Sequence, residues 1–106
     1  MNRGERRALL HYRLRGYRLV EANARAGGYE LDLIVRRGRR LVVVEVKEKS
    51  GPGFGHPLEM IDGEKQRRVL AATEAWLARH PEAAGLELEL EAAAVQGGRV
   101  ERVPLS

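Results

Sequence analysis

Residues 29–49 read YELDLIVRRGRRLVVVEVKEK, and they decide the fold because they encode two strands joined by a tight turn. Tyr29–Arg36 alternates apolar and charged residues, which is typical of a strand. Arg37-Gly38-Arg39 supplies a hairpin turn, and Arg40–Lys49 follows with a run of valines. Since this run is apolar on both faces, it predicts a central strand that is covered on both sides.

Upstream of this hairpin, the sequence predicts one helix and one short strand. Residues 4–15 form the helix: Leu10 and Leu14 are one turn apart, and Ala8, Leu9 and Tyr12 widen the apolar stripe. Gly16 is expected to end the helix, because glycine adopts the left-handed conformation after a helix at little cost. Tyr17–Glu21 then suits a short strand.

Downstream, the sequence predicts a glycine-rich loop over Ser50–His56, a second helix and two more strands. The helix covers Gly63–His80 and is capped by Asp62, and the strands cover Leu86–Val95 and Arg99–Val103. The order is therefore helix, three strands, helix, two strands. It predicts one mixed α/β (α+β) domain over residues 1–106, with a central mixed sheet of about five strands and two helices.

Composition limits the classes of site and the compartment. The chain has no cysteine, which excludes disulfides and cysteine-ligated metal sites. No apolar run is long enough to span a bilayer, and the N-terminal MNRGERR leads into no signal-peptide core. These features predict a cytoplasmic protein that does not enter a membrane.

The charge of the chain is divided unevenly along its length. Residues 1–49 hold 13 Lys/Arg and 6 Asp/Glu (13 − 6 = +7), whereas residues 50–106 hold 6 and 9 (6 − 9 = −3). Sixteen of the nineteen basic residues are arginine, whose planar guanidinium suits bidentate contacts to phosphate. This pattern is compatible with a nucleic-acid partner, and equally with an arginine-rich surface that has no such partner.

Acidic residues converge on the predicted hairpin. If its loop has two or four residues, Glu30 faces Glu45 and Asp32 faces Val43, so that Asp32 and Glu45 are diagonal neighbours on one face. In this arrangement Leu31, Leu33 and Val35 share the other face. A three-residue loop would instead place Asp32 and Glu45 on opposite faces.

Ionised carboxylates on such an apolar face need a counter-charge, because leaving them unpaired costs several kcal/mol each. Lys47, on the face of Glu45, offers one positive charge. A hard divalent cation, Mg²⁺ or Mn²⁺, would supply the rest. The alternative is a solvated hairpin with a simple Glu45–Lys47 ion pair.

The run GGYELDLIVRRGRRLVVVEVKEKS resembles the G-G-E-I-D-L-I … L-V-F-V-E-V-K-x-R stretch of the YraN-like bacterial proteins. Gly4-Glu5, Gly16-Tyr17, Asn23, FGHPLEMIDGEKQRR and Ala75-Trp76-Leu77 extend the similarity over about the first four fifths of the chain. Tyr29 departs from the glycine usual in that family, and Lys49 stands where arginine is frequent. The family is grouped with restriction-endonuclease-like and Holliday-junction-resolvase-like nucleases.

This resemblance implies a restriction-endonuclease-like core and the D…ExK nuclease motif, carried by Asp32, Glu45 and Lys47. It implies a metal held by Asp32, Glu45, the carbonyl of Val46 and Glu5 from the first helix, with Glu30 a weaker candidate ligand than Glu5. The expected cofactor is Mg²⁺ or Mn²⁺. Resolvases of this fold commonly act as twofold dimers, so the resemblance also favours a homodimer.

Three functions are compatible with these features. The first is a metal-dependent endonuclease that hydrolyses DNA phosphodiesters, with branched or junction DNA as one candidate substrate. The second is a non-catalytic nucleic-acid-binding module with a nuclease-like fold, and the third is a protein-interaction role. The residues expected to bind the nucleic-acid backbone are Lys49, Lys65, Arg67, Arg68 and Arg7.

Overall fold

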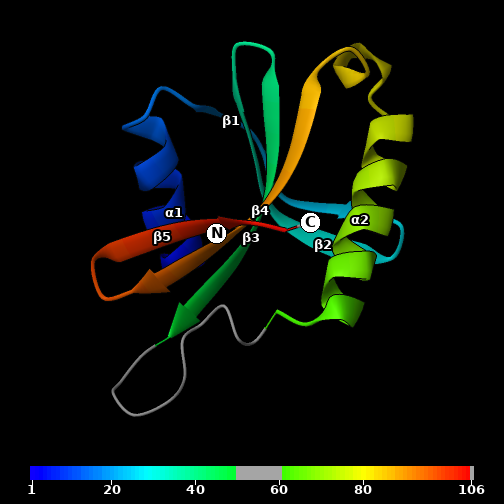
Figure 1. Cartoon of the computed structure of the whole chain (residues 1–106). Coiled ribbons are helices and arrows are strands. Elements are labelled where there is room, and N and C mark those ends of the chain that lie inside the picture. The colour runs from blue at the N-terminus through cyan, green and yellow to red at the C-terminus, as the bar shows by residue number, and fades with distance from the viewer. Residues whose placement is uncertain (50–60, 106) are drawn as a thin grey trace.

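The chain builds a five-stranded mixed sheet with one helix on each face (Figure 1). The computed structural model describes residues 1–49 and 61–105; the predicted Ser50–His56 loop lies outside these residues. The elements are α1 (Arg3–Arg13), β1 (Arg18–Ala26), β2 (Tyr29–Arg37), β3 (Arg40–Lys49), α2 (Gly63–Ala78), a 3₁₀ turn η2 (Pro81–Ala83), β4 (Glu87–Gln96) and β5 (Arg99–Pro104). Their order confirms the predicted fold class.

The strands lie in the order β1-β2-β3-β4-β5, so that β3 is central as its valine run predicted. β3 and β4 are parallel, and the other neighbouring pairs are antiparallel. The parallel pair is joined through α2, as such a connection requires a crossover. α2 contacts β1 and β2, while α1 contacts the opposite face.

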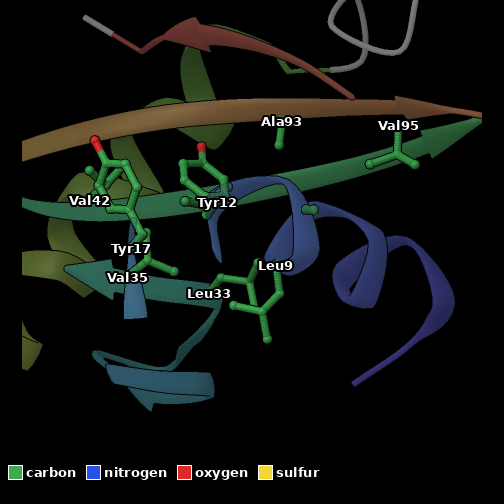
Figure 2. Close-up of a cluster of buried hydrophobic side chains, with 10 residues drawn as sticks. Leu9, Tyr12, Tyr17, Leu33, Val35, Val42, Ala93 and Val95 are labelled. Atoms are coloured by element: carbon green, nitrogen blue, oxygen red, sulfur yellow. The ribbon is translucent and has the colours of Figure 1, made fainter. Parts of the chain in front are cut away.

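Two apolar clusters separate the helices from the sheet. On the α1 side, Leu9 and Tyr12 pack against buried side chains of the three inner strands, β2, β3 and β4. Figure 2 shows this cluster, with Leu33, Val35, Val42, Ala93 and Val95 labelled on the strands. On the α2 side, Val69, Ala72 and Trp76 pack against Ile34 and Val43.

The predicted apolar stripe of the first helix was wrong in one respect. Leu10 and Leu14 are 58% and 74% exposed, whereas Ala8, Leu9 and Tyr12 are buried. The buried face also includes Glu5, because this residue and Leu9 lie one turn apart, on average roughly 140° around the helix from Leu10 and Leu14. The side of the helix that meets the sheet thus carries a carboxylate.

The ends of α1, α2 and β1 can be compared with the predicted boundaries. Asp62 caps α2 through its side chain, as predicted, and accepts a hydrogen bond from the amide of Lys65. α1 ends at Arg13, and Gly16, in the turn that follows the helix, has a φ of +90°. This left-handed conformation confirms that the helix does not continue past Gly16. The first strand is longer than the predicted Tyr17–Glu21, since β1 continues to Ala26 and pairs with β2 along most of its length.

The hairpin register differs from the predicted one by two residues. Arg37 pairs with Arg40, Ile34 with Val43 and Leu33 with Val44, which places Asp32 toward Glu45 rather than Val43. The cause is a two-residue turn that begins at Gly38, whose φ of +60° suits the first position of such a turn. Because the shift is an even number of residues, each side chain of the paired region keeps its predicted side of the sheet.

Candidate metal and catalytic site

The ladder between β2 and β3 opens at Asp32. The paired residues end at Leu33 and Val44, and beyond them the amide of Val46 donates to Asp32 Oδ2 at 2.8 Å. A side-chain carboxylate thus replaces a main-chain acceptor at this point. It holds Asp32 between the two strands, where the carboxylate is half-buried.

The regular alternation of side chains between the two faces of β2 is also interrupted at Asp32. Leu31 packs in the α2-side cluster, whereas Leu33 packs in the α1-side cluster, so the prediction that both share one face was wrong. In β1, Asn23 lies between Ala22, which pairs with Leu33, and Ala24, which pairs with Leu31. Asn23 has a φ of +52°, a left-handed conformation that rotates the following residues to the other face.

Three carboxylates converge at this irregularity. Glu5, Glu30 and Asp32 each present an oxygen, and these atoms all lie within 4.8 Å of one another. Glu5 is fixed at the start of α1 by a reciprocal cap, in which Asn2 accepts from the Glu5 amide and Glu5 Oε1 accepts from the Asn2 amide. Asn23 Nδ2 donates to both Glu5 and Glu30, at 3.2 Å to one oxygen of each.

Glu45 lies beside this cluster and is only 4% exposed. Its Oε1 accepts from the Tyr29 hydroxyl at 3.2 Å and lies 3.3 Å from Lys65 Nζ. Its Oε2 is buried, and no group in the described part of the chain donates to it. Burial raises the pKa of Glu45, with the Lys65 charge acting in the opposite direction.

Asp32 carries the clearest electrostatic perturbation. Its pKa is raised to about 7, first by burial and then by the negative charge of Glu45, while the amide of Val46 acts in the opposite direction. The structure therefore holds these two carboxylates close together with less positive charge than they need. Such a mismatch is common where a protein binds a ligand or carries out chemistry.

Two lysines face Glu45 from different elements. Lys47 extends from β3, and its pKa is lowered first by its contact with Lys65 and then by burial. Lys65 comes from the first turn of α2 and forms the ion pair with Glu45. Next to them is a cavity of about 260 Å³, lined by Tyr29, Asp62, Glu64, Lys65 and Arg68.

The donor set fits a hard divalent cation. Carboxylate oxygens are the ligands that Mg²⁺ and Mn²⁺ prefer, and here they come from helix α1 and strand β2, with Glu45 adjacent. The buried Glu45 Oε2 without a donor is the independent sign of fit, because such an atom normally has a partner. The carboxylates present are thus sufficient in number and type for one such ion.

The structure brings together most of the residues predicted for the site. Asp32, Glu45, Lys47 and Glu5 lie in one region, and Glu30, ranked below Glu5 from the sequence, contributes equally to the carboxylate cluster. Val46 takes part through its amide, which holds Asp32, and the role of its carbonyl as a metal ligand stays a prediction.

The residues predicted to bind nucleic acid fall into different places. Lys65 points into the site toward Glu45, and Arg68 lines the adjacent cavity while paired with Glu64. Arg7 donates to the carbonyl of Gly97. Arg67 is exposed and lines a separate, more apolar cavity with Leu70 and Leu90, and Lys49 lies at the end of β3.

Asn23 and Tyr29 also belong to the site, although the sequence predicted no role for either residue there. Asn23 joins two carboxylates, and Tyr29 hydrogen-bonds to Glu45. An asparagine among the small residues of a strand is a weak signal of left-handed backbone. Tyr29 directly precedes the acidic strand, but only the fold shows that its hydroxyl reaches Glu45.

Membrane insertion through a helix finds no support in the structure. Among the described residues, neither helix combines the length and apolar character that a bilayer span requires.

Comparison with known proteins identifies a family. Residues 4–101 match the model of the uncharacterised protein family UPF0102. A UPF0102 protein of Alkalilimnicola ehrlichii is 48% identical over 79 residues, which cover 74% of this chain and 63% of that protein. UPF0102 proteins of Methylorubrum extorquens and Methylobacterium nodulans are 45% and 42% identical, over 90% and 92% of this chain and 73% and 74% of theirs. The match thus covers less than two thirds of the first relative and about three quarters of the other two, and the chain belongs to the UPF0102 family.

Proposed function

We propose that this protein is a metal-dependent endonuclease that hydrolyses DNA phosphodiesters. The observation that carries the proposal is the meeting of Glu5, Glu30 and Asp32 within 4.8 Å, beside a buried Glu45 oxygen that has no donor. A pure binding surface for an anionic polymer would gain nothing from gathering carboxylates there, since they repel phosphate.

The residues divide the work according to their positions. Asp32 and Glu45, with Glu5 and Glu30, would hold Mg²⁺ or Mn²⁺. The chemistry that such an ion supplies when bound is polarisation of a phosphoryl oxygen and a lower pKa for water. Lys47 Nζ orients the attacking water and can accept its proton, since its pKa is below that of an ordinary lysine.

Lys65 and Tyr29 act through Glu45. Their contacts of 3.3 and 3.2 Å fix one oxygen of that carboxylate and leave the other directed elsewhere. They are positioning residues in this proposal. Arg68 at the rim of the adjacent cavity is suited to hold a phosphate next to the one that is cut.

The decisive experiment is cleavage of a labelled four-way junction, a plain duplex and a single strand in Mg²⁺, Mn²⁺ or EDTA. We expect metal-dependent cutting by the wild type, and a loss of at least about a hundredfold in Asp32→Ala and Lys47→Ala. Glu74→Gln, which changes an exposed acidic residue of α2, is the matched control and should cut normally. Circular dichroism would establish that all variants are folded.

Retained cutting by Asp32→Ala would refute this site. If no substrate is cut but nucleic acid binds tightly and in a salt-sensitive way, the protein is a binding module with a nuclease-like fold; the arginine excess of residues 1–49 is the observation that favours this second candidate. Cytoplasmic location and a twofold dimer stay predictions, the second testable by light scattering.

A further inference from the structure

A group of arginines lies at the opposite end of the sheet from the carboxylates. We name Arg15, Arg18, Arg36 and Arg37 the arginine surface. Arg18 and Arg36 are direct partners on β1 and β2, and Arg37 Nη1 donates to the carbonyl of Arg15 at 2.8 Å. In Figure 1 the β2–β3 turn and the C-terminal end of α1 lie at the upper end of the view, and β3 runs down toward its C-terminal end.

Three of the four guanidinium groups of this surface are held by neutral partners. Arg15 donates to the carbonyl of His11 at 2.9 Å and Arg36 to that of Gly38 at 2.8 Å. Arg37 lies over the ring of Tyr17, with 4.7 Å between the guanidinium carbon and the ring centre. Among the residues that the structure describes, none of the four contacts a carboxylate within 4.0 Å.

Arg40, a neighbouring arginine, differs from these four because it has a carboxylate partner. Arg40, at the start of β3, has its charge matched by Glu89 at 2.6 Å. Hydrogen bonds hold the side chains of Arg15, Arg36 and Arg37, and most of the five N–H donors of each of these guanidinium groups remain unused. Arg18 and Arg36 lie directly opposite each other on neighbouring strands and repel each other, whereas Arg37, beside Arg15 and Tyr17, projects to the other face at the same end of the sheet. An anion with several regularly spaced charges removes the repulsion between such groups.

We infer that the arginine surface binds the phosphate backbone of duplex DNA away from the position that is cut. This inference rests on the proposed function for its choice of DNA. Asp32 and Arg36 are four residues apart on β2, which corresponds to about 13 Å along the strand. With one phosphate per roughly 3.4 Å of each strand, a backbone that touches both regions extends about four nucleotides beyond the scissile phosphate.

The test is binding of a labelled duplex of about 20 base pairs, measured by fluorescence anisotropy in EDTA, so that cleavage is not required. Arg18→Gln/Arg36→Gln is compared with Arg79→Gln/Arg99→Gln, which removes two exposed arginines elsewhere. Each double variant lowers the formal charge by two, from +4 to +2. Thermal unfolding identifies any variant that is misfolded, and Arg15→Gln/Arg18→Gln replaces the first pair if Arg36 proves necessary for folding.

We expect the arginine-surface variant to bind about tenfold more weakly, with the slope of log affinity against log salt smaller by about two. The matched control should lose no more than about threefold. Equal losses in the two double variants would overturn the inference, as would a loss of binding to phosphatidylserine vesicles with unchanged duplex binding. Since neither readout needs catalysis, a failure of the nuclease proposal in the cleavage assay is distinguishable from a failure of this one.

Discussion

Two buried carboxylates on neighbouring strands of this sheet have opposite surroundings. Glu91 on β4 receives both nitrogens of the Arg102 fork, at 2.9 and 3.1 Å, and the Tyr12 hydroxyl at 2.7 Å. Glu45 on β3 receives one hydroxyl and one ammonium on a single oxygen, and its other oxygen has no donor in the described part of the chain.

The pKa values of the two groups follow from these partners. Burial alone would raise the pKa of Glu91, but the hydrogen bonds from Arg102 and Tyr12 bring it below its ordinary value. For Glu45, burial prevails over Lys65, and the pKa is raised. The difference teaches that the fold can satisfy a buried carboxylate fully where structure requires it, so that the incomplete shell around Glu45 indicates a place for a ligand.

The largest expected effect comes from breaking the satisfied shell. Arg102→Met leaves Glu91 buried without its cation, and we expect the free energy of unfolding to fall by about 3 kcal/mol, measured by urea denaturation. The double variant Glu91→Met/Arg102→Met removes both charges and should regain part of this loss. A loss below about 1 kcal/mol in the single variant would mean that Glu91 is less dependent on Arg102 than its geometry indicates.

Completing the other shell should stabilise the protein. Mn²⁺ or Mg²⁺ at a hundredfold excess over its dissociation constant is expected to raise the free energy of unfolding by about 2.7 kcal/mol, seen as a higher Tm than in EDTA. Arg102→Met should keep this response, because its change is at Glu91. Asp32→Asn should lose the response, and an unchanged metal-induced shift in that variant would place the ion elsewhere.

Without metal, the charge of Asp32 should reduce stability. Its folded pKa of about 7 is above its ordinary 3.8, so the folded state binds the proton more tightly, and stability falls as pH rises from about 4 to 7. Asp32→Asn can still accept from Val46. We therefore expect Asp32→Asn in EDTA to match the wild type at pH 4 and to exceed its stability by about 1 to 2 kcal/mol at pH 8, measured by thermal unfolding. An equal difference at both pH values would argue against the raised pKa.

The smallest expected effects compare the two tyrosines. Tyr12→Phe removes a buried hydrogen bond to Glu91 and should reduce the free energy of unfolding by about 1 kcal/mol. Tyr29→Phe removes a longer hydrogen bond, to a Glu45 carboxylate whose partners are already incomplete. We expect this variant to change the free energy of unfolding by less than about 0.5 kcal/mol. Chemical denaturation of both variants side by side tests this order, and the reverse order would contradict the comparison.

The sequence was sufficient for the elements and for the central residues of the candidate site. The valine run predicted the central strand, and the pattern of the two strands predicted that Asp32 and Glu45 lie near each other, although the register was two residues off. A register error of two residues keeps every side chain of the paired region on its predicted face. The proximity of the two carboxylates could therefore be predicted, whereas the residue directly opposite each of them could not.

Features that depend on tertiary geometry could not be predicted in this way. The left-handed Asn23 and the switch of Leu31 to the α2 side arise from an irregularity shared by two strands, which strict alternation excludes. Lys65 was predicted from the sequence only as a contact to the nucleic-acid backbone. Its ion pair with Glu45 could not be predicted, because only the packing of α2 brings the two side chains together.

The hydrogen bond from Val46 to Asp32 also makes the site observable. A backbone amide resonance shifts strongly with the charge and occupancy of the group that accepts its proton, and Val46 has a single acceptor, Asp32 Oδ2 at 2.8 Å. In a ¹⁵N-labelled sample this one cross-peak is a built-in reporter of proton loss and ion binding at Asp32. The protein thus carries its own spectroscopic probe at the centre of the candidate site, and a titration needs neither a substrate nor a mutation to follow it.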